Sequence, residues 1–151
     1  MKRLIALLVV LVIAHNVQSR REQDALGRCV TEAQGDLKHL LDKAYGTEQY
    51  AGPLRTSPTT PARVRASLDA LVTGSVASEL PVLRADRQDC EFWVLPWHGS
   101  ERDAYVRYLD ARLAQLQLAT TDVGALHTDA AARARTAAQE ALRDVGLTVS
   151  P

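Results

Sequence analysis

The sequence predicts an all-α protein: a small bundle of four or five helices behind an N-terminal signal peptide or signal anchor, with one disulfide. Three observations support this prediction. Apolar residues recur at helical spacing along most of the chain, an unbroken apolar run follows a basic N-terminus, and there are two cysteines. The 151 residues are enough for one domain with its own buried core.

The N-terminus has the layout of an export signal. Residues 4–14 (LIALLVVLVIA) are all apolar, follow a short basic segment, and precede moderate or small residues at 17–19, where a signal peptidase would cut. A spanning helix needs roughly 20 apolar residues, so we divide the chain into a secretory signal peptide at 1–19 and an extracytoplasmic helical domain at 20–151. The alternative is an uncleaved anchor, with membrane association through residues 4–17. Either way, the body is expected outside the cytoplasm, secreted or held at the membrane.

The two cysteines are predicted to pair. Cys29 and Cys90 form an even set in an exported chain, the setting in which disulfides persist. They lack the CxxC spacing of zinc and redox sites. We therefore predict a structural disulfide, no metal site and no cofactor.

A first helix is predicted within 20–45. Its apolar positions alternate in steps of four and three, which places them on one stripe: Leu26, Val30, Ala33, Leu37, Leu40 and Ala44. Gly46 is expected to end this helix. The prolines and small polar residues of 47–60 predict an exposed loop.

The remaining helices are predicted at 60–74, 78–89, 101–123 and 128–146. Gly74 separates the first two. Ser100 with Asp103 forms a short version of the capping box and is expected to begin the third. The last helix is predicted to face the bundle through small residues: Ala130, Ala134, Ala137, Ala141 and Val145.

The stretch CEFWVLPWHGSERD, at 90–103, holds most of the aromatic residues close to a proline that argues against a regular helix or strand. The favoured interpretation is that its rings close the core while Cys90 fastens the loop. The alternative is an aromatic-lined groove for a peptide, glycan or lipid, in which Trp93, Trp97 and His98 would bind the ligand.

Two clusters offer catalytic or metal chemistry. His98 with Glu101 or Asp103 has the residue types of a general base and its orienting partner, although acids in a first helical turn are explained by the helix dipole.

Glu32, Asp36 and His39 are spaced at i, i+4 and i+7 on one helix edge. They would bind a metal only if His98 or His127 joined them; a hydrated helix flank explains them more simply.

Charge and motifs exclude several function classes. The 18 basic and 18 acidic residues balance, so no excess charge attracts nucleic acid. Serine-hydrolase, zinc-protease and phosphate-loop motifs are absent. The preference for arginine and alanine is typical of a GC-rich bacterial genome. We therefore assign no catalytic residue and expect a non-enzymatic binding or interaction module at the cell envelope, with an unidentified envelope protein or ligand as partner. The alternative is an extracytoplasmic hydrolase or metal-dependent enzyme that uses His98 with nearby carboxylates.

Overall fold

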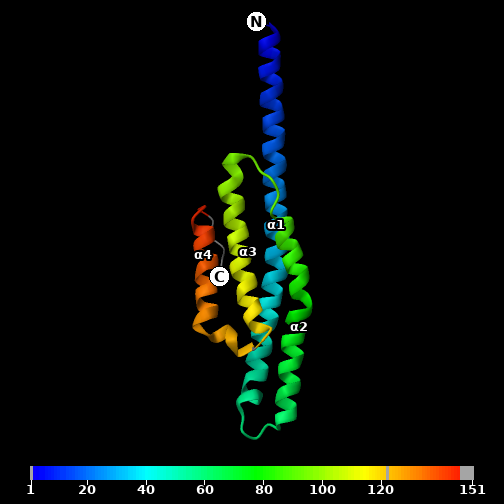
Figure 1. The fold of residues 1–151 in the computed structure, drawn as a ribbon, viewed down its shortest axis with the longest axis vertical. Helices are drawn as coiled ribbons and strands as arrows, with labels where there is room; N and C mark the ends of the chain where they lie inside the picture. The colour runs from blue at the N-terminus through cyan, green and yellow to red at the C-terminus, as the bar shows by residue number, and fades with distance from the viewer. Residues whose placement is uncertain (1, 122, 147–151) are drawn as a thin grey trace.

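The computed structural model describes residues 2–121 and 123–146, and all the secondary structure in these ranges is helical. The elements are α1 (Lys2–Thr56), α2 (Ala62–Asp89), the 3-10 helix η1 (Pro96–His98), α3 (Gly99–Ala119), the 3-10 helix η2 (Val123–His127) and α4 (Asp129–Arg143). Helices α1, α2 and α3 lie side by side and α4 packs against α3, while the N-terminal part of α1 projects beyond the bundle (Figure 1). The predicted all-α class is confirmed.

Helix α1 is longer than the sequence predicts. The expected end at Gly46 is wrong, because the helix continues to Thr56 and contains Pro53 in its last turn. Of the loop expected at 47–60, only residues 57–60 are non-helical. Buried residues lie on both sides of Gly46, among them Ala44 and Ala51. A glycine in a helix costs about 1 kcal/mol, and continuous packing against the rest of the bundle outweighs that cost.

Helix α2 joins the two segments predicted at 60–74 and 78–89, so Gly74 does not end a helix. Val76, Leu80 and Leu83 form a buried stripe at i, i+4 and i+7 that begins after Gly74 and passes Pro81. Proline leaves the carbonyl four residues earlier without its helical partner. Here that carbonyl belongs to Ala77, and since both residues are exposed, water can solvate it.

The predicted capping box of α3 is wrong. The helix begins at Gly99 rather than Ser100, no side chain caps its first turn, and the Asp103 carboxylate accepts hydrogen bonds from Arg102. Because η1 leads directly into α3, the Pro96 carbonyl already accepts the Gly99 N–H. The turn before the helix thus supplies an acceptor that a capping side chain would otherwise provide.

Helix α4 presents a different face from the one predicted. Its buried residues are Ala131, Ala138, Ala141 and Leu142, whereas Ala137 is exposed. The expectation for Ala137 is wrong and that for Ala141 is confirmed. Gly146 follows the helix with φ +73°, a left-handed conformation that glycine adopts readily.

The predicted disulfide is present. Cys29 of α1 is bonded to Cys90, which follows the last residue of α2. Their Cα atoms are 5.7 Å apart, and their sequence separation is 61. The buried core includes Leu40, Leu80, Leu109, Leu116 and Leu126, together with Cys90 itself. The disulfide therefore ties α1 to the start of the loop that leads to α3.

We expect the Cys29→Ala/Cys90→Ala variant to lose roughly 2–4 kcal/mol of unfolding free energy, because the disulfide restricts the unfolded chain over a long loop. Chemical unfolding of the full chain in mild detergent, followed by circular dichroism, measures this loss. The reduced wild type is the matched control and should match the variant. Equal stability of the oxidised wild type and the variant would contradict the expected role.

Candidate functional site

The loop between α2 and α3 turns both tryptophans outward. Trp93 is 70% exposed and Trp97 is 52% exposed, so the expectation that these rings close the core is wrong. Burial alternates along the extended part of the loop, where Cys90 and Val94 are buried, Phe92 is partly buried, and Trp93 points the other way. An extended chain places successive side chains on opposite sides. With Cys90 fixed inward by its disulfide, Trp93 faces solvent.

His98 differs from its neighbours because only 7% of it is exposed. Its Nε2 lies 3.0 Å from Ser19 Oγ of α1, at hydrogen-bonding distance. Of the three residues predicted to bind a ligand, two therefore lie on the surface and the third is enclosed between α1 and the start of α3.

Glu22 is the second enclosed polar residue, with 3% of its surface exposed. One carboxylate oxygen accepts the Leu95 backbone N–H at 2.9 Å, and the other accepts Gln18 Nε2 at 2.8 Å. Burying a charged group is costly unless it is well hydrogen-bonded, and here both oxygens have donors. Glu22 therefore holds the loop backbone against α1.

We call this contact between helix and loop the junction. It comprises His15, Gln18, Ser19 and Glu22 of α1 with Leu95, Trp97 and His98 of the loop. The four α1 residues are spaced at i, i+3, i+4 and i+7, which places them on one helix face. Sequence reasoning missed this polar face because residues 15–19 were assigned to the region around a cleavage site.

Ser19 and His98 of the junction lie near the carboxylate of Glu101, so a serine, a histidine and a carboxylate are close together. His98 Nδ1 lies 3.7 Å from Glu101 Oε2, which is too long for a hydrogen bond, while Asp103 is engaged by Arg102. Ser19 lies inside a continuous helix, where its own N–H is committed to the helical ladder and is not free to stabilise an oxyanion. The arrangement therefore has the residue types of a hydrolytic triad without its hydrogen-bonded geometry.

Tyr105 lies beside Glu101 and interacts with its carboxylate. Its hydroxyl donates to Glu101 Oε1 at 3.4 Å. Burial, together with the neighbouring Glu101 carboxylate, raises the pKa of the Tyr105 phenol. The phenol therefore stays protonated at neutral pH and acts as a hydrogen-bond donor.

The alternative of a metal site on the edge of α1 gains no support from the residues that the structure describes. Asp36 and His39 are exposed, and the side chain of Glu32 lies outside the described part of the structure. His98 is in the junction, and the His127 ring packs against Tyr45 with centroids 5.6 Å apart. Within the described residues, no three metal-binding side chains come together.

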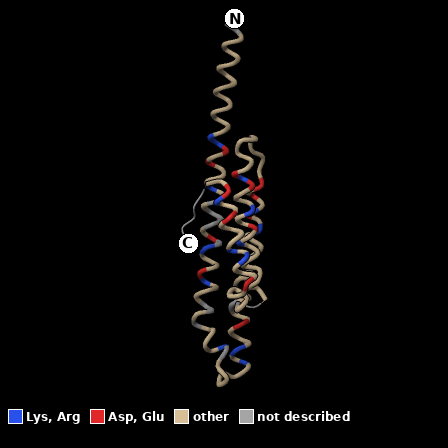
Figure 2. The backbone as a smooth tube through the Cα atoms, turned by 90° about the vertical axis from the view of Figure 1, so that its left-hand side faces the viewer, with Lys and Arg blue, Asp and Glu red and all other residues tan. Residues whose placement is uncertain are grey.

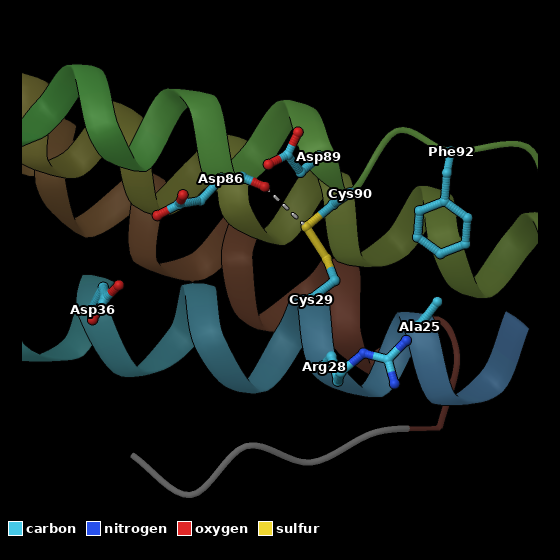
Figure 3. A pocket seen from close by; sticks show the side chains of 8 residues that line it. All are labelled: Ala25, Arg28, Cys29, Asp36, Asp86, Asp89, Cys90 and Phe92. Atoms are coloured by element: carbon cyan, nitrogen blue, oxygen red, sulfur yellow. Dashed lines mark hydrogen bonds between the residues drawn. A yellow bond between two sulfur atoms is a disulfide. The ribbon is translucent and has the colours of Figure 1, made fainter. Parts of the chain in front are cut away.

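A groove of about 430 Å³ lies beside the disulfide, between α1 and α2 (Figure 3). Asp36, Asp86 and Asp89 line it together with Arg28, and Phe92 lies at its end towards the loop. Asp36, Asp89 and Arg28 are exposed, so water solvates these charges and the groove offers no enclosed binding site.

Comparison with known proteins finds no family model, no curated protein and no solved structure that matches this chain. The geometry of the junction and of the projecting helix therefore provides the clues to what this chain does.

We expect Glu22→Ala to lower the unfolding free energy by about 1–3 kcal/mol, because the partly buried Leu95 N–H loses its acceptor. Hydrogen exchange of the Leu95 amide should become faster. Glu22→Gln retains an oxygen acceptor and should protect this amide better than alanine does. Asp24→Ala, at an exposed position two residues away, is the matched control and should change neither quantity. An unchanged Leu95 exchange rate in Glu22→Ala would show that the hydrogen bond does not hold the loop.

Proposed function

We propose that this chain is a membrane-anchored helical module that acts by contact rather than by catalysis, with α1 as its anchor and the bundle outside the cytoplasm. The observation that carries this proposal is the continuity of α1, which runs without a break from the exposed apolar segment into the bundle. The loop that bears Trp93 and Trp97 is its contact surface.

The projecting part of α1 has the properties of an anchor. Residues 4–19 contain no charged side chain, and residues 4–18 are exposed along their whole length. In the described chain, the one stretch that is long and apolar enough to cross a membrane lies within Leu4–Cys29, near the N-terminus. Figure 2 shows an uncharged tube over residues 4–19 and mixed charges over the bundle. At 1.5 Å per residue, residues 4–19 extend about 24 Å, a length that flanking basic side chains can complete by reaching to the headgroups.

The junction supports retention of the N-terminal segment. Cleavage after Ser19 would remove His15, Gln18 and Ser19, and with them the ring contact to Trp97 and the hydrogen bond to His98. His98 would then lose the partner of a buried nitrogen. The cost of leaving a buried polar group unpaired, about 1–3 kcal/mol, favours the anchor over a cleaved signal peptide.

The disulfide supports the orientation. Basic residues flank both ends of the apolar segment, at Lys2-Arg3 and at Arg20-Arg21, so the distribution of positive charge does not decide which end faces the cytoplasm. The Cys29–Cys90 bond lies in the bundle, and such bonds persist in oxidising compartments. We therefore place the bundle on the extracytoplasmic side.

We expect the chain to remain in membranes washed with alkaline carbonate and to retain residues 4–19, as measured by intact mass. Leu8→Arg places a charge within the apolar segment at a cost of about 2.5–3.5 kcal/mol and should reduce the carbonate-resistant fraction. Leu71→Arg, at an exposed position of α2, is the matched control and should leave that fraction unchanged. A soluble chain that begins near Arg20 would instead establish a cleaved, secreted protein.

The hydrolase alternative has one favourable observation, the 3.0 Å approach of Ser19 Oγ and His98 Nε2. Since Glu101 does not hydrogen-bond to His98, we expect a fluorophosphonate probe, which modifies activated serines, to leave Ser19 unlabelled. Ser19→Ala is the control for labelling at other serines. Labelling of Ser19 that disappears in His98→Gln would establish the hydrolase and overturn the non-catalytic proposal.

A further inference from the structure

The tryptophan-bearing loop lies at the end of the bundle from which α1 projects (Figure 1). The Trp97 and His15 ring centroids are 4.7 Å apart. His15 directly follows the apolar run at 4–14. Trp97 is therefore level with the point where the exposed apolar segment ends.

From Leu95 to Trp97, the loop runs along α1 towards the N-terminal apolar segment. The Leu95 N–H is bonded to Glu22, whereas Trp97 contacts His15. These two α1 positions are about 10 Å apart along the helix axis at 1.5 Å per residue. Phe92 borders the groove at Ala25 and Arg28, farther still from the apolar segment. Trp93 follows Phe92 in the chain, so Trp97 is the nearer of the two indoles to the apolar segment.

We propose that Trp97 lies in the boundary between headgroups and acyl chains of the membrane that α1 crosses, with Trp93 nearer the aqueous side. The contact surface of the loop is thus a lipid surface. This inference rests on the proposed anchor. A bilayer that encloses the uncharged residues 4–19 has its boundary at the end of this segment. His15 and Ser19 lie there, and they contact Trp97 and His98 of the loop.

The chemistry of the loop fits this partner. Tryptophan is enriched at membrane–water interfaces because its ring is apolar and its N–H is polar. Trp97 and its neighbour Pro96 are exposed, while His98 behind them is enclosed. The bonds of Glu22 and His98 hold the loop in place before lipid is met, so membrane contact requires little ordering of the backbone.

The chain contains two tryptophans, and both are in this loop. Trp93→Phe and Trp97→Phe therefore each leave one fluorescent indole to observe. The full chain is reconstituted into vesicles of phosphatidylcholine and phosphatidylglycerol, with and without bromine on the upper acyl carbons. In Trp93→Phe, we expect bromolipid to lower Trp97 emission about twofold and aqueous iodide to quench it weakly. In Trp97→Phe, Trp93 should be quenched less by bromolipid and more by iodide. The double variant gives the background.

The outcomes separate this inference from the proposed function. Circular dichroism and disulfide content establish that each variant is folded. If the chain resists carbonate extraction but Trp97 is quenched by iodide and not by bromolipid, the lipid contact is wrong and the anchor stands. Protection of Trp97 from both quenchers would indicate a protein contact, including one with a second copy, and would also overturn the inference. If carbonate releases the chain, the anchor fails and the lipid contact fails with it.

Discussion

The unbroken backbone hydrogen bonding of α1 is the constraint on which the rest of the structure depends. A helix satisfies its own N–H and C=O groups, so it can pass from an apolar to an aqueous environment without exposing unpaired backbone. Helix α1 contains an uncharged, exposed segment at one end and core residues such as Leu40 and Ala44 further along. Any position that the N-terminal segment takes is therefore transmitted directly to the bundle. This continuity is why we propose that the loop, and Trp97 in it, is held at the level of the membrane boundary.

The junction adds specificity to that rigid connection. Glu22 and His98 are polar groups in an enclosed place, where each unsatisfied atom would be costly. Their hydrogen bonds to Leu95 and Ser19 are satisfied with the loop seated against α1. The disulfide fastens the same loop at Cys90. Together, a covalent bond and a buried polar contact hold the loop at two points and leave its tryptophans outside.

Pairing between helices illustrates how tertiary contacts replace local ones. Helical spacing predicts an ion pair between Arg107 and Asp110, three residues apart. In the structure, Asp110 instead accepts two hydrogen bonds from Arg87 of α2, each 2.7 Å long, and Arg107 reaches Asp144. The bond to Asp110 is the largest cause of the raised pKa of the Arg87 guanidinium, against a smaller opposing effect of desolvation. A bidentate pair across two helices provides better geometry than neighbours on one helix.

The sequence by itself determined the helical class, the apolar N-terminal segment and the cysteine pair, because periodicity, hydropathy and cysteine count are properties of the chain alone. It also placed the proline-containing loop between two helices. Only the tertiary structure decided that α1 passes Gly46, that α2 passes Gly74 and Pro81, and that Ala138 rather than Ala137 is buried. At the glycines and the proline, packing against a neighbouring helix outweighed a local preference of a few kcal/mol or less. For the two alanines, the face of α4 that packs against α3 decided which one is buried. The junction could not be predicted, because its partners are over 70 residues apart and no local pattern indicates which buried N–H or ring nitrogen a distant side chain will meet.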